Sequence, residues 1–221
     1  MRAVFAELIS AALMAEALIG CGSNTEPQKT VAGQRGSSAK TQAAEANRTR
    51  AQTCCYRGIA CAEKGDLDGA IVDFTEAIRL DPECARAYQG RALACAKKGE
   101  FDKVIADCTE AIRLDPNDAE GYRGRALANR EKGNLDGAVA DYSEAIRLNP
   151  NRAAYYYGRG VVYTKKGDFD KAIADNSEAI RLDPGYAQAY YGRGVLYAEK
   201  GDTDKANKDF DQAKQLGLKP Q

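Results

Sequence analysis

The stretch Ala153–Tyr186 reads AAYYYGRGVVYTKKGDFDKAIADNSEAIRLDPGY, and its frame returns along the chain. TEAIRLDP begins at Thr75 and again at Thr109, SEAIRLNP begins at Ser143, and SEAIRLDP begins at Ser177, so the period is 34 residues. A single helical pair of this length cannot bury its own apolar face, whereas stacked copies of the pair can. The sequence therefore predicts a repeat protein.

Each unit divides into two helices. Across residues 153–166 the aromatic and small side chains are spaced by three to four, as one helix face requires. Gly167 ends this helix, and Asp168 can cap the next one because its carboxylate accepts from free backbone amides. A second apolar stripe runs from Ala172 to Leu182, and Pro184 ends it because proline disfavours the helical conformation of the residue before it.

These spacings resemble the tetratricopeptide repeat (TPR), which has aromatic residues at positions 4, 11 and 24, Gly or Ala at 8, Ala at 20 and 27, and Pro at 32. In the unit that begins at Ala153, only Asn176 departs from this pattern. The pattern recurs in units that span residues 51–84, 85–118, 119–152, 153–186 and 187–220. The resemblance implies an all-α fold, a right-handed TPR solenoid of five helix-turn-helix repeats and ten helices, over a domain at residues 51–220.

The N-terminal segment Met1–Gly20, MRAVFAELISAALMAEALIG, has a basic residue near its start, a mostly apolar middle and small residues at its end. This layout predicts a secretory signal peptide over residues 1–20. The tetrapeptide LIGC that ends at Cys21 resembles the bacterial lipobox, which implies lipidation of Cys21 and cleavage before it. Glu7 and Glu16 favour an alternative, an amphipathic leader on a cytosolic protein, because a central charge in a lipid-partitioning segment costs roughly 2.5 to 3.5 kcal/mol.

Residues 21–50 are rich in Gly, Ser, Thr, Gln, Asn, Lys and Glu and have almost no aromatic or branched apolar side chain. Such a segment buries too little surface to offset its ordering entropy, so we expect a flexible linker. In a lipoprotein this linker would hold the repeats away from the bilayer. Its last part, Thr41–Arg50, could instead extend the first helix of the repeats.

The charges balance, with 32 basic and 32 acidic residues, so no net field would attract nucleic acid. Every unit carries an arginine at position 7 and an aspartate at position 23. We expect these to pair between the two helices of a unit: Arg57 with Asp73, Arg91 with Asp107, Arg125 with Asp141, Arg159 with Asp175, and Arg193 with Asp209.

Six cysteines fall in the first two repeats, and several of them take positions where other units have an aromatic residue. We expect buried thiols, because free cysteine packs as a small apolar side chain. If a disulfide forms, Cys54 with Cys84 is the more plausible pair, since the end of a unit returns beside the start of its first helix. The chain has no histidine and no CxxC pair, so we expect neither a metal nor a cofactor.

Position 6 is glycine in four units, at Gly90, Gly124, Gly158 and Gly192. Glycine either allows tight packing between helices or lets the backbone of a ligand come close. In the last unit, Asn207, Lys208 and Lys214 replace apolar residues of earlier units, so we expect a polar surface at the end of the array.

The chain has no nucleophile beside a base and no phosphate loop, so we expect no enzymatic activity. The TPR resemblance implies that the first helices line a concave groove that binds a protein or peptide. The candidate contacts in that groove are Gln89, Leu93, Arg123, Leu127, Arg130, Tyr157, Val161, Tyr191 and Val195.

The function expected from the sequence is thus a non-catalytic interaction scaffold that is lipid-anchored in a bacterial envelope and faces the periplasm. The alternative is a soluble cytoplasmic TPR adaptor without the anchor.

Overall fold

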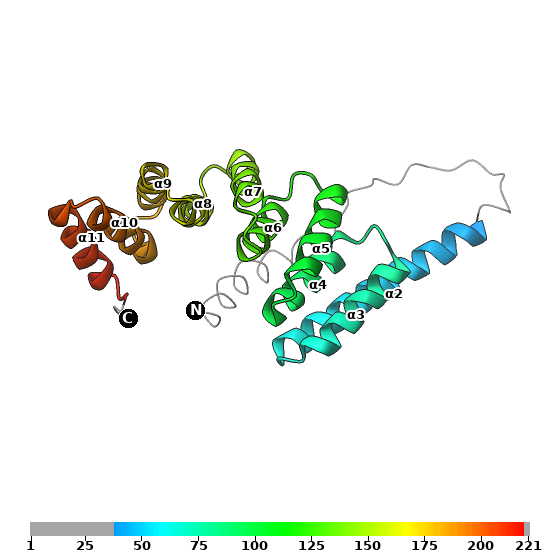
Figure 1. Cartoon of the computed structure of the whole chain (residues 1–221). Helices are drawn as coiled ribbons and strands as arrows, with labels where there is room; N and C mark the ends of the chain where they lie inside the picture. The colour runs from blue at the N-terminus through cyan, green and yellow to red at the C-terminus, as the bar shows by residue number, and fades with distance from the viewer. Residues whose placement is uncertain (1–37, 219–221) are drawn as a thin grey trace. The chain divides into compact units, whose positions relative to one another are not determined.

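The computed structural model describes residues 38–218, which form ten helices and no strand (Figure 1). The first helices of the five repeats are α2 (Ser38–Glu63), α4 (Ala85–Lys98), α6 (Ala119–Glu131), α8 (Ala153–Lys166) and α10 (Ala187–Glu199). The second helices are α3 (Leu67–Leu80), α5 (Phe101–Leu114), α7 (Leu135–Leu148), α9 (Phe169–Leu182) and α11 (Thr203–Gln215). The predicted all-α repeat fold is confirmed.

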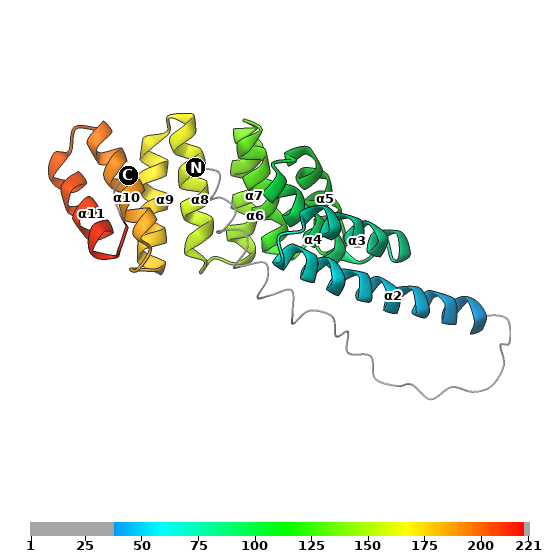
Figure 2. The same ribbon diagram turned by 90° about the horizontal axis from the view of Figure 1, so that it is seen from below.

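The helices fall into two units, which divide between Pro116 and Asn117. Unit 1 contains α2 to α5, and unit 2 contains α6 to α11. Inside each unit a first helix packs on its own second helix, and that second helix packs on the first helix of the next repeat. Figure 2 shows this for unit 2, where α8 to α11 lie side by side. The stacking buries the face that one helical pair leaves open.

The helix ends follow the local sequence. Gly167 ends α8 with φ of +77°, the left-handed conformation that glycine adopts without strain. Asp168 then caps α9, where its carboxylate accepts from the Lys171 backbone N–H at 3.4 Å. Asp183, which precedes Pro184, has extended backbone angles and ends α9.

Helix α2 is longer than the other first helices because it begins at Ser38, before the first repeat. Residues 38–50 of the segment expected to be a linker are therefore helical, as the possible extension over Thr41–Arg50 allowed. Residues 41–50 are all exposed. The alanine, glutamate, glutamine, lysine and arginine residues of this segment favour a helix through their intrinsic propensity. The predicted signal peptide and Cys21 lie outside the described residues. Within residues 38–218, no helix combines the length and apolarity that a membrane span needs.

Alanines form the centre of each repeat. In unit 2, Ala138 and Ala145 on α7 and Ala172 and Ala179 on α9 are fully buried. Position 24, between these alanines, holds a larger buried side chain, which is Phe74 in the first repeat and Tyr142 in the third. The short alanines let helices approach closely, and the position 24 side chain fills the space toward the next repeat.

The glycines at position 6 lie against these position 24 side chains. A Cβ atom built on Gly90 would stand 2.4 Å from the Phe74 ring, and one built on Gly158 would stand 2.4 Å from the Tyr142 ring. Any side chain there would overlap the ring. The packing explanation of these two glycines is therefore favoured over the ligand explanation.

The second helix of the last repeat presents the expected polar surface. Asn207, Lys208 and Lys214 on α11 are all exposed. After α11 the Leu218 backbone N–H donates to the Ala213 carbonyl at 3.0 Å, with Gly217 in the left-handed conformation. The polar face allows this end of unit 2 to meet water.

Candidate functional site

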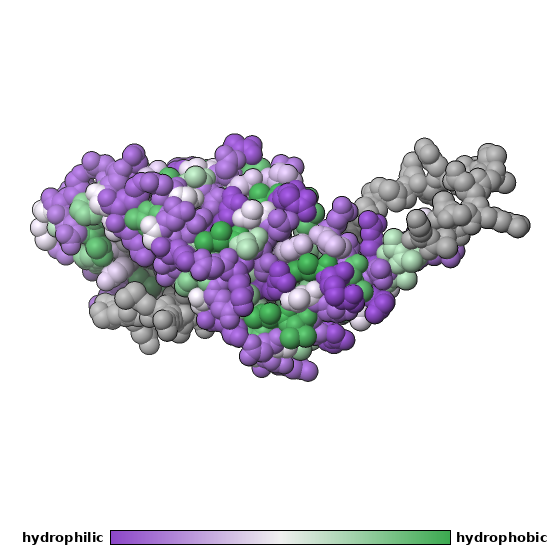
Figure 3. Space-filling model, turned by 45° about the vertical axis from the view of Figure 1, so that its right-hand side comes forward, coloured by the Kyte–Doolittle hydropathy of each residue, from purple (hydrophilic) through white to green (hydrophobic). Residues whose placement is uncertain are grey.

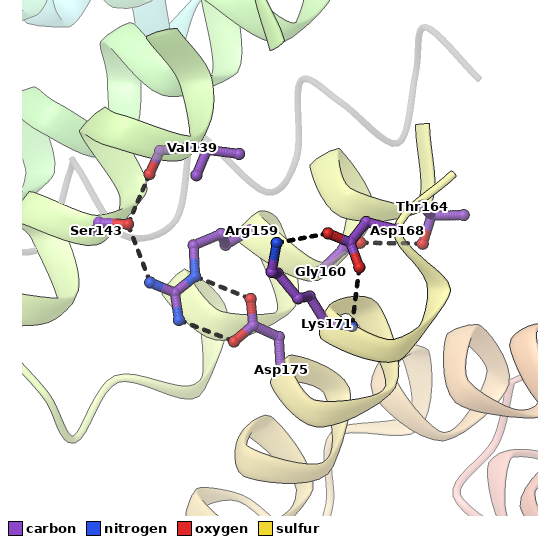
Figure 4. Close-up of polar contacts among 8 residues, drawn as sticks. All are labelled: Val139, Ser143, Arg159, Gly160, Thr164, Asp168, Lys171 and Asp175. Carbon is purple, nitrogen blue, oxygen red and sulfur yellow. Dashed lines mark hydrogen bonds and ion pairs between the residues drawn. The ribbon is translucent and has the colours of Figure 1, made fainter. Parts of the chain in front are cut away.

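Each of the five predicted Arg–Asp pairs is present, and each links the two helices of one repeat. In the fourth repeat, Arg159 Nε and Nη2 on α8 donate to the two carboxylate oxygens of Asp175 on α9, both at 2.9 Å (Figure 4). The nearest distances are 2.7 Å for Arg91 with Asp107, 2.8 Å for Arg125 with Asp141, and 2.8 Å for Arg193 with Asp209. Arg57 and Asp73 form the fifth pair.

Three of these arginines, Arg91, Arg159 and Arg193, also reach the preceding repeat of their unit. Arg159 Nη1 donates to Ser143 Oγ on α7 at 3.0 Å, and Arg193 Nη1 donates to Ser177 Oγ on α9 at 2.9 Å. One guanidinium thus joins three helices. Arg57, in the first repeat, is 59% exposed at its side chain, whereas Arg159 is 20% exposed. Arg159 and Arg193 thus connect neighbouring repeats of unit 2.

In unit 1, the two predicted contact residues lie on α4. Leu93 is buried and belongs to the packing of the repeat, and Gln89 is half-buried. Neither projects fully into solvent. Unit 1 instead exposes two large apolar side chains that were not among the candidates, Tyr56 at 57% and Val72 at 66%. A sequence signal existed for Tyr56, because it occupies position 6, where the other four repeats have glycine.

Arg123, one of the candidate groove contacts, is buried in unit 2. Its Nε donates to Glu120 Oε2 at 2.6 Å, and the Tyr155 hydroxyl donates to Glu120 Oε1 at 2.6 Å. Burial alone would lower the pKa of Arg123, but the adjacent Glu120 carboxylate outweighs it and raises that pKa. Arg123 Nη2 is buried without a hydrogen-bond partner. The guanidinium therefore belongs to an internal ion pair on α6.

The remaining candidates in unit 2 lie on α6, α8 and α10. Tyr157 packs edge-on against Tyr186, with ring centroids 5.2 Å apart, and its burial raises the pKa of the Tyr157 hydroxyl. Tyr191 rests against Phe210 with centroids 5.5 Å apart, yet it is 40% exposed. Leu127, Val161, Val195 and Arg130 are partly exposed. We call the six candidates the first-helix face of unit 2: Leu127, Arg130, Tyr157, Val161, Tyr191 and Val195. Tyr191 is the most exposed aromatic side chain of this face.

Polar residues dominate the face of the molecule that is drawn in space-filling form (Figure 3). Figure 3 shows hydrophilic residues over most of the visible face, with apolar residues in small separate patches. Within the described range 38–218, no three His, Cys, Asp or Glu side chains are grouped so that they could hold a metal ion.

None of the six cysteines of the repeats, all within the described residues, forms a disulfide. Cys54, Cys55, Cys95 and Cys108 are buried, and Cys61 and Cys84 are half-buried. The expected proximity of Cys54 to Cys84 is wrong, because Cys55 is the residue whose Sγ lies 3.8 Å from Cys84 Sγ. The rotation of α2 decides this: Arg57 Nη2 lies 3.9 Å from Cys54 Sγ, while Cys55 turns toward Cys84.

Models of known families match most of the chain. A tetratricopeptide repeat model matches residues 51–84 and 85–118, a TPR repeat model matches residues 127–167 and 160–201, and another tetratricopeptide repeat model matches residues 187–216. No curated protein sequence gives a significant match.

Solved structures share the architecture. Two crystal structures of MamA resemble the chain: one is 28% identical, covers 77% of this chain and 98% of its own, and has a TM-score of 0.70. The other is 31% identical, covers 72% of this chain and 93% of its own, and has a TM-score of 0.68. YrrB, described as a TPR protein with an unusual peptide-binding site, is 23% identical, with coverages of 81% and 92% and a TM-score of 0.65. At that identity the likeness to YrrB shows the fold alone.

Proposed function

Because the chain belongs to the tetratricopeptide repeat family, we propose that it is a non-catalytic scaffold that binds a protein or peptide through the first-helix face of unit 2. The observation that carries this proposal is Tyr191, a large aromatic side chain held at 40% exposure by Phe210 beneath it. Exposed aromatic side chains with restricted rotamers are common anchors of protein interfaces.

The neighbouring residues suit the same role. Val161 on α8 and Val195 on α10 give partly exposed aliphatic surface along the row of first helices. The peptide-binding site named for YrrB, which shares the fold, supports a peptide or an extended segment as the occupant.

Site-specific photo-cross-linking tests this function. A photoreactive aromatic amino acid replaces Tyr191 on α10 in one variant and Ala174, an exposed residue of α9, in a matched control. We expect discrete cross-linked partners from position 191 and few from position 174. Equal cross-linking from both positions, or cross-linking from position 174 alone, would exclude the first-helix face as the binding surface.

We further propose that the scaffold is tethered to a bacterial cell envelope through a lipid on Cys21. The support is in the sequence: the apolar segment before Cys21 and the tetrapeptide LIGC. Mass spectrometry of the membrane fraction tests the anchor. A mature chain that begins at acylated Cys21 agrees with the tether, and an intact chain with Met1 in the soluble fraction contradicts it and leaves a soluble scaffold.

A further inference from the structure

Unit 1 brings two thiols from distant parts of the first repeat into contact. Cys55 lies in the middle of α2, and Cys84 directly precedes α4. Their Sγ atoms are 3.8 Å apart, although the residues are 29 positions apart in the chain. A disulfide has an S–S distance of about 2.05 Å, so the two sulfurs need to approach by only about 1.8 Å.

The two thiols differ in accessibility. Cys55 is 1% exposed, whereas Cys84 is half-buried and can be reached from solvent. Cys84 also stands at the N-terminus of α4, where the helix dipole favours a thiolate. Arg86, two residues further on, adds a positive charge nearby. A partly exposed sulfur at a helix N-terminus next to an arginine is the arrangement of a reactive cysteine.

The hydrogen bond between the two thiols separates their acidities. The bond from Cys55 lowers the pKa of Cys84 to about 6, with the Ala87 backbone amide and Arg86 acting in the same direction against burial. The same bond, followed by burial, raises the pKa of Cys55 far above its ordinary value. These opposite directions make Cys84 the more acidic thiol of the pair.

We propose that Cys55 and Cys84 are a reversible disulfide site, in which Cys84 attacks the oxidant and Cys55 resolves the intermediate. The oxidant is a disulfide, RSSR, such as oxidised glutathione or an oxidised dithiol protein. The Cys84 thiolate attacks one sulfur of RSSR, forms a mixed disulfide and releases RS⁻. Cys55 then loses its proton and attacks Cys84 Sγ, which breaks the mixed disulfide and releases a second RS⁻. The protein loses two electrons, and RSSR is reduced to two thiols.

Cys95 and Cys61 lie in different environments from this pair. Cys95 is buried in the second repeat, and burial raises its pKa to about 11. Cys61 Sγ lies 3.9 Å from the Asp73 carboxylate instead of from another thiol. The disulfide would join α2 to the segment that connects α3 and α4. The bond would thereby restrain the end of the first repeat from which α2 extends toward the N-terminus.

Peptide mapping of the full chain tests the site. The protein is equilibrated in glutathione buffers from fully reduced to fully oxidised, alkylated, and digested with trypsin. Cys55 falls in the peptide AQTCCYR, residues 51–57, and Cys84 falls in LDPECAR, residues 80–86. We expect these two peptides to become linked in oxidising buffer and to separate again after reduction. Separately alkylated peptides at every buffer composition would overturn the proposal.

Two variants identify the cysteine within residues 51–57. Cys54→Ser should keep the linked peptides, and Cys55→Ser should lose them. Fragmentation of the linked peptides from the unchanged protein gives the same answer without any substitution, so poor folding of Cys55→Ser does not obscure the result. A bond assigned to Cys54 would overturn the proposal.

A thermal melt gives an independent readout. Oxidation should raise the unfolding midpoint of the unchanged protein, because the bond closes a loop of about 30 residues and restricts the unfolded chain. This shift should vanish in Cys84→Ser. An equal shift in that variant would show that the oxidation acts elsewhere.

Discussion

Replacing Gly158 by alanine tests whether the position 6 glycines serve packing. Alanine is the better helix former by about 1 kcal/mol, so an open site would gain stability. At Gly158 the new Cβ would lie 2.4 Å from Tyr142 Cζ and 2.6 Å from its hydroxyl oxygen. Tyr142 is 1% exposed, so we expect the strain to reach the upper part of the ~1–3 kcal/mol range for overpacking. The net expectation is a loss of about 2 kcal/mol.

Gly192 provides a matched control at the same position of the next repeat. There the position 24 residue is Asn176 instead of an aromatic, and a Cβ would lie 3.5 Å from its side chain, an ordinary contact. Gly192→Ala should therefore gain about 1 kcal/mol. The two variants should differ by about 3 kcal/mol, which corresponds to roughly 1 to 2 M between their urea midpoints. Circular dichroism of the full chain during urea titration measures this difference.

A double variant checks the cause. Tyr142→Asn removes the ring that the new methyl group would meet, so adding Gly158→Ala to it should cost nothing or stabilise the protein. If Gly158→Ala unfolds at the same urea concentration as Gly192→Ala or a higher one, the steric reasoning is refuted. The glycine would then have to be explained by the approach of a ligand backbone.

Three further outcomes follow from the same contacts. Asp175→Ala leaves the largely buried guanidinium of Arg159 without its carboxylate, so it should lower the free energy of unfolding in urea by roughly 2 to 3 kcal/mol. Asp170→Ala is the control on the same helix. The Asp170 side chain is 83% exposed, so this variant should cost less than about 1 kcal/mol. Deleting residues 1–50 should reduce the helical circular dichroism signal and leave the unfolding midpoint unchanged, because residues 41–50 are exposed. A lower midpoint would show that this segment packs on the repeats. Iodoacetamide should modify Cys84 at a rate that rises as the pH passes about 6, because the thiolate of Cys84 forms there. It should spare Cys95 at neutral pH, since burial raises the pKa of Cys95 to about 11. Peptide mapping reads out both rates, and equal rates would contradict the assigned environments.

The ion pairs show how far sequence reasoning reaches. Position 7 and position 23 are separated by a fixed number of residues in every repeat, so one geometric argument predicted all five Arg–Asp pairs. The second bond of these arginines, from Arg159 to Ser143 of the preceding repeat, was not predicted. It depends on how one repeat stacks on the next, and the pattern inside a repeat carries no information about that stacking.

The candidate contacts illustrate the limit. Arg123 and Tyr157 occupy positions that face outward in the family pattern, yet Glu120 and Tyr186 engage them inside the protein. Both partners are specific to single repeats, so the shared pattern could not reveal them. The nearest thiol pair was likewise missed by one residue, because a rotation of about 100° per residue around α2 decides whether position 54 or 55 faces Cys84.

The sequence by itself determined the local units of this protein. Apolar spacing, Gly and Asp caps and a 34-residue period specify helices whose limits depend on nearby residues alone. Tertiary structure decided which side chains remain exposed to solvent and which contact a neighbour. Whether a tyrosine, an arginine or a thiol meets solvent or a neighbour is set by the packing distance between helices, to which residues of separate repeats contribute together.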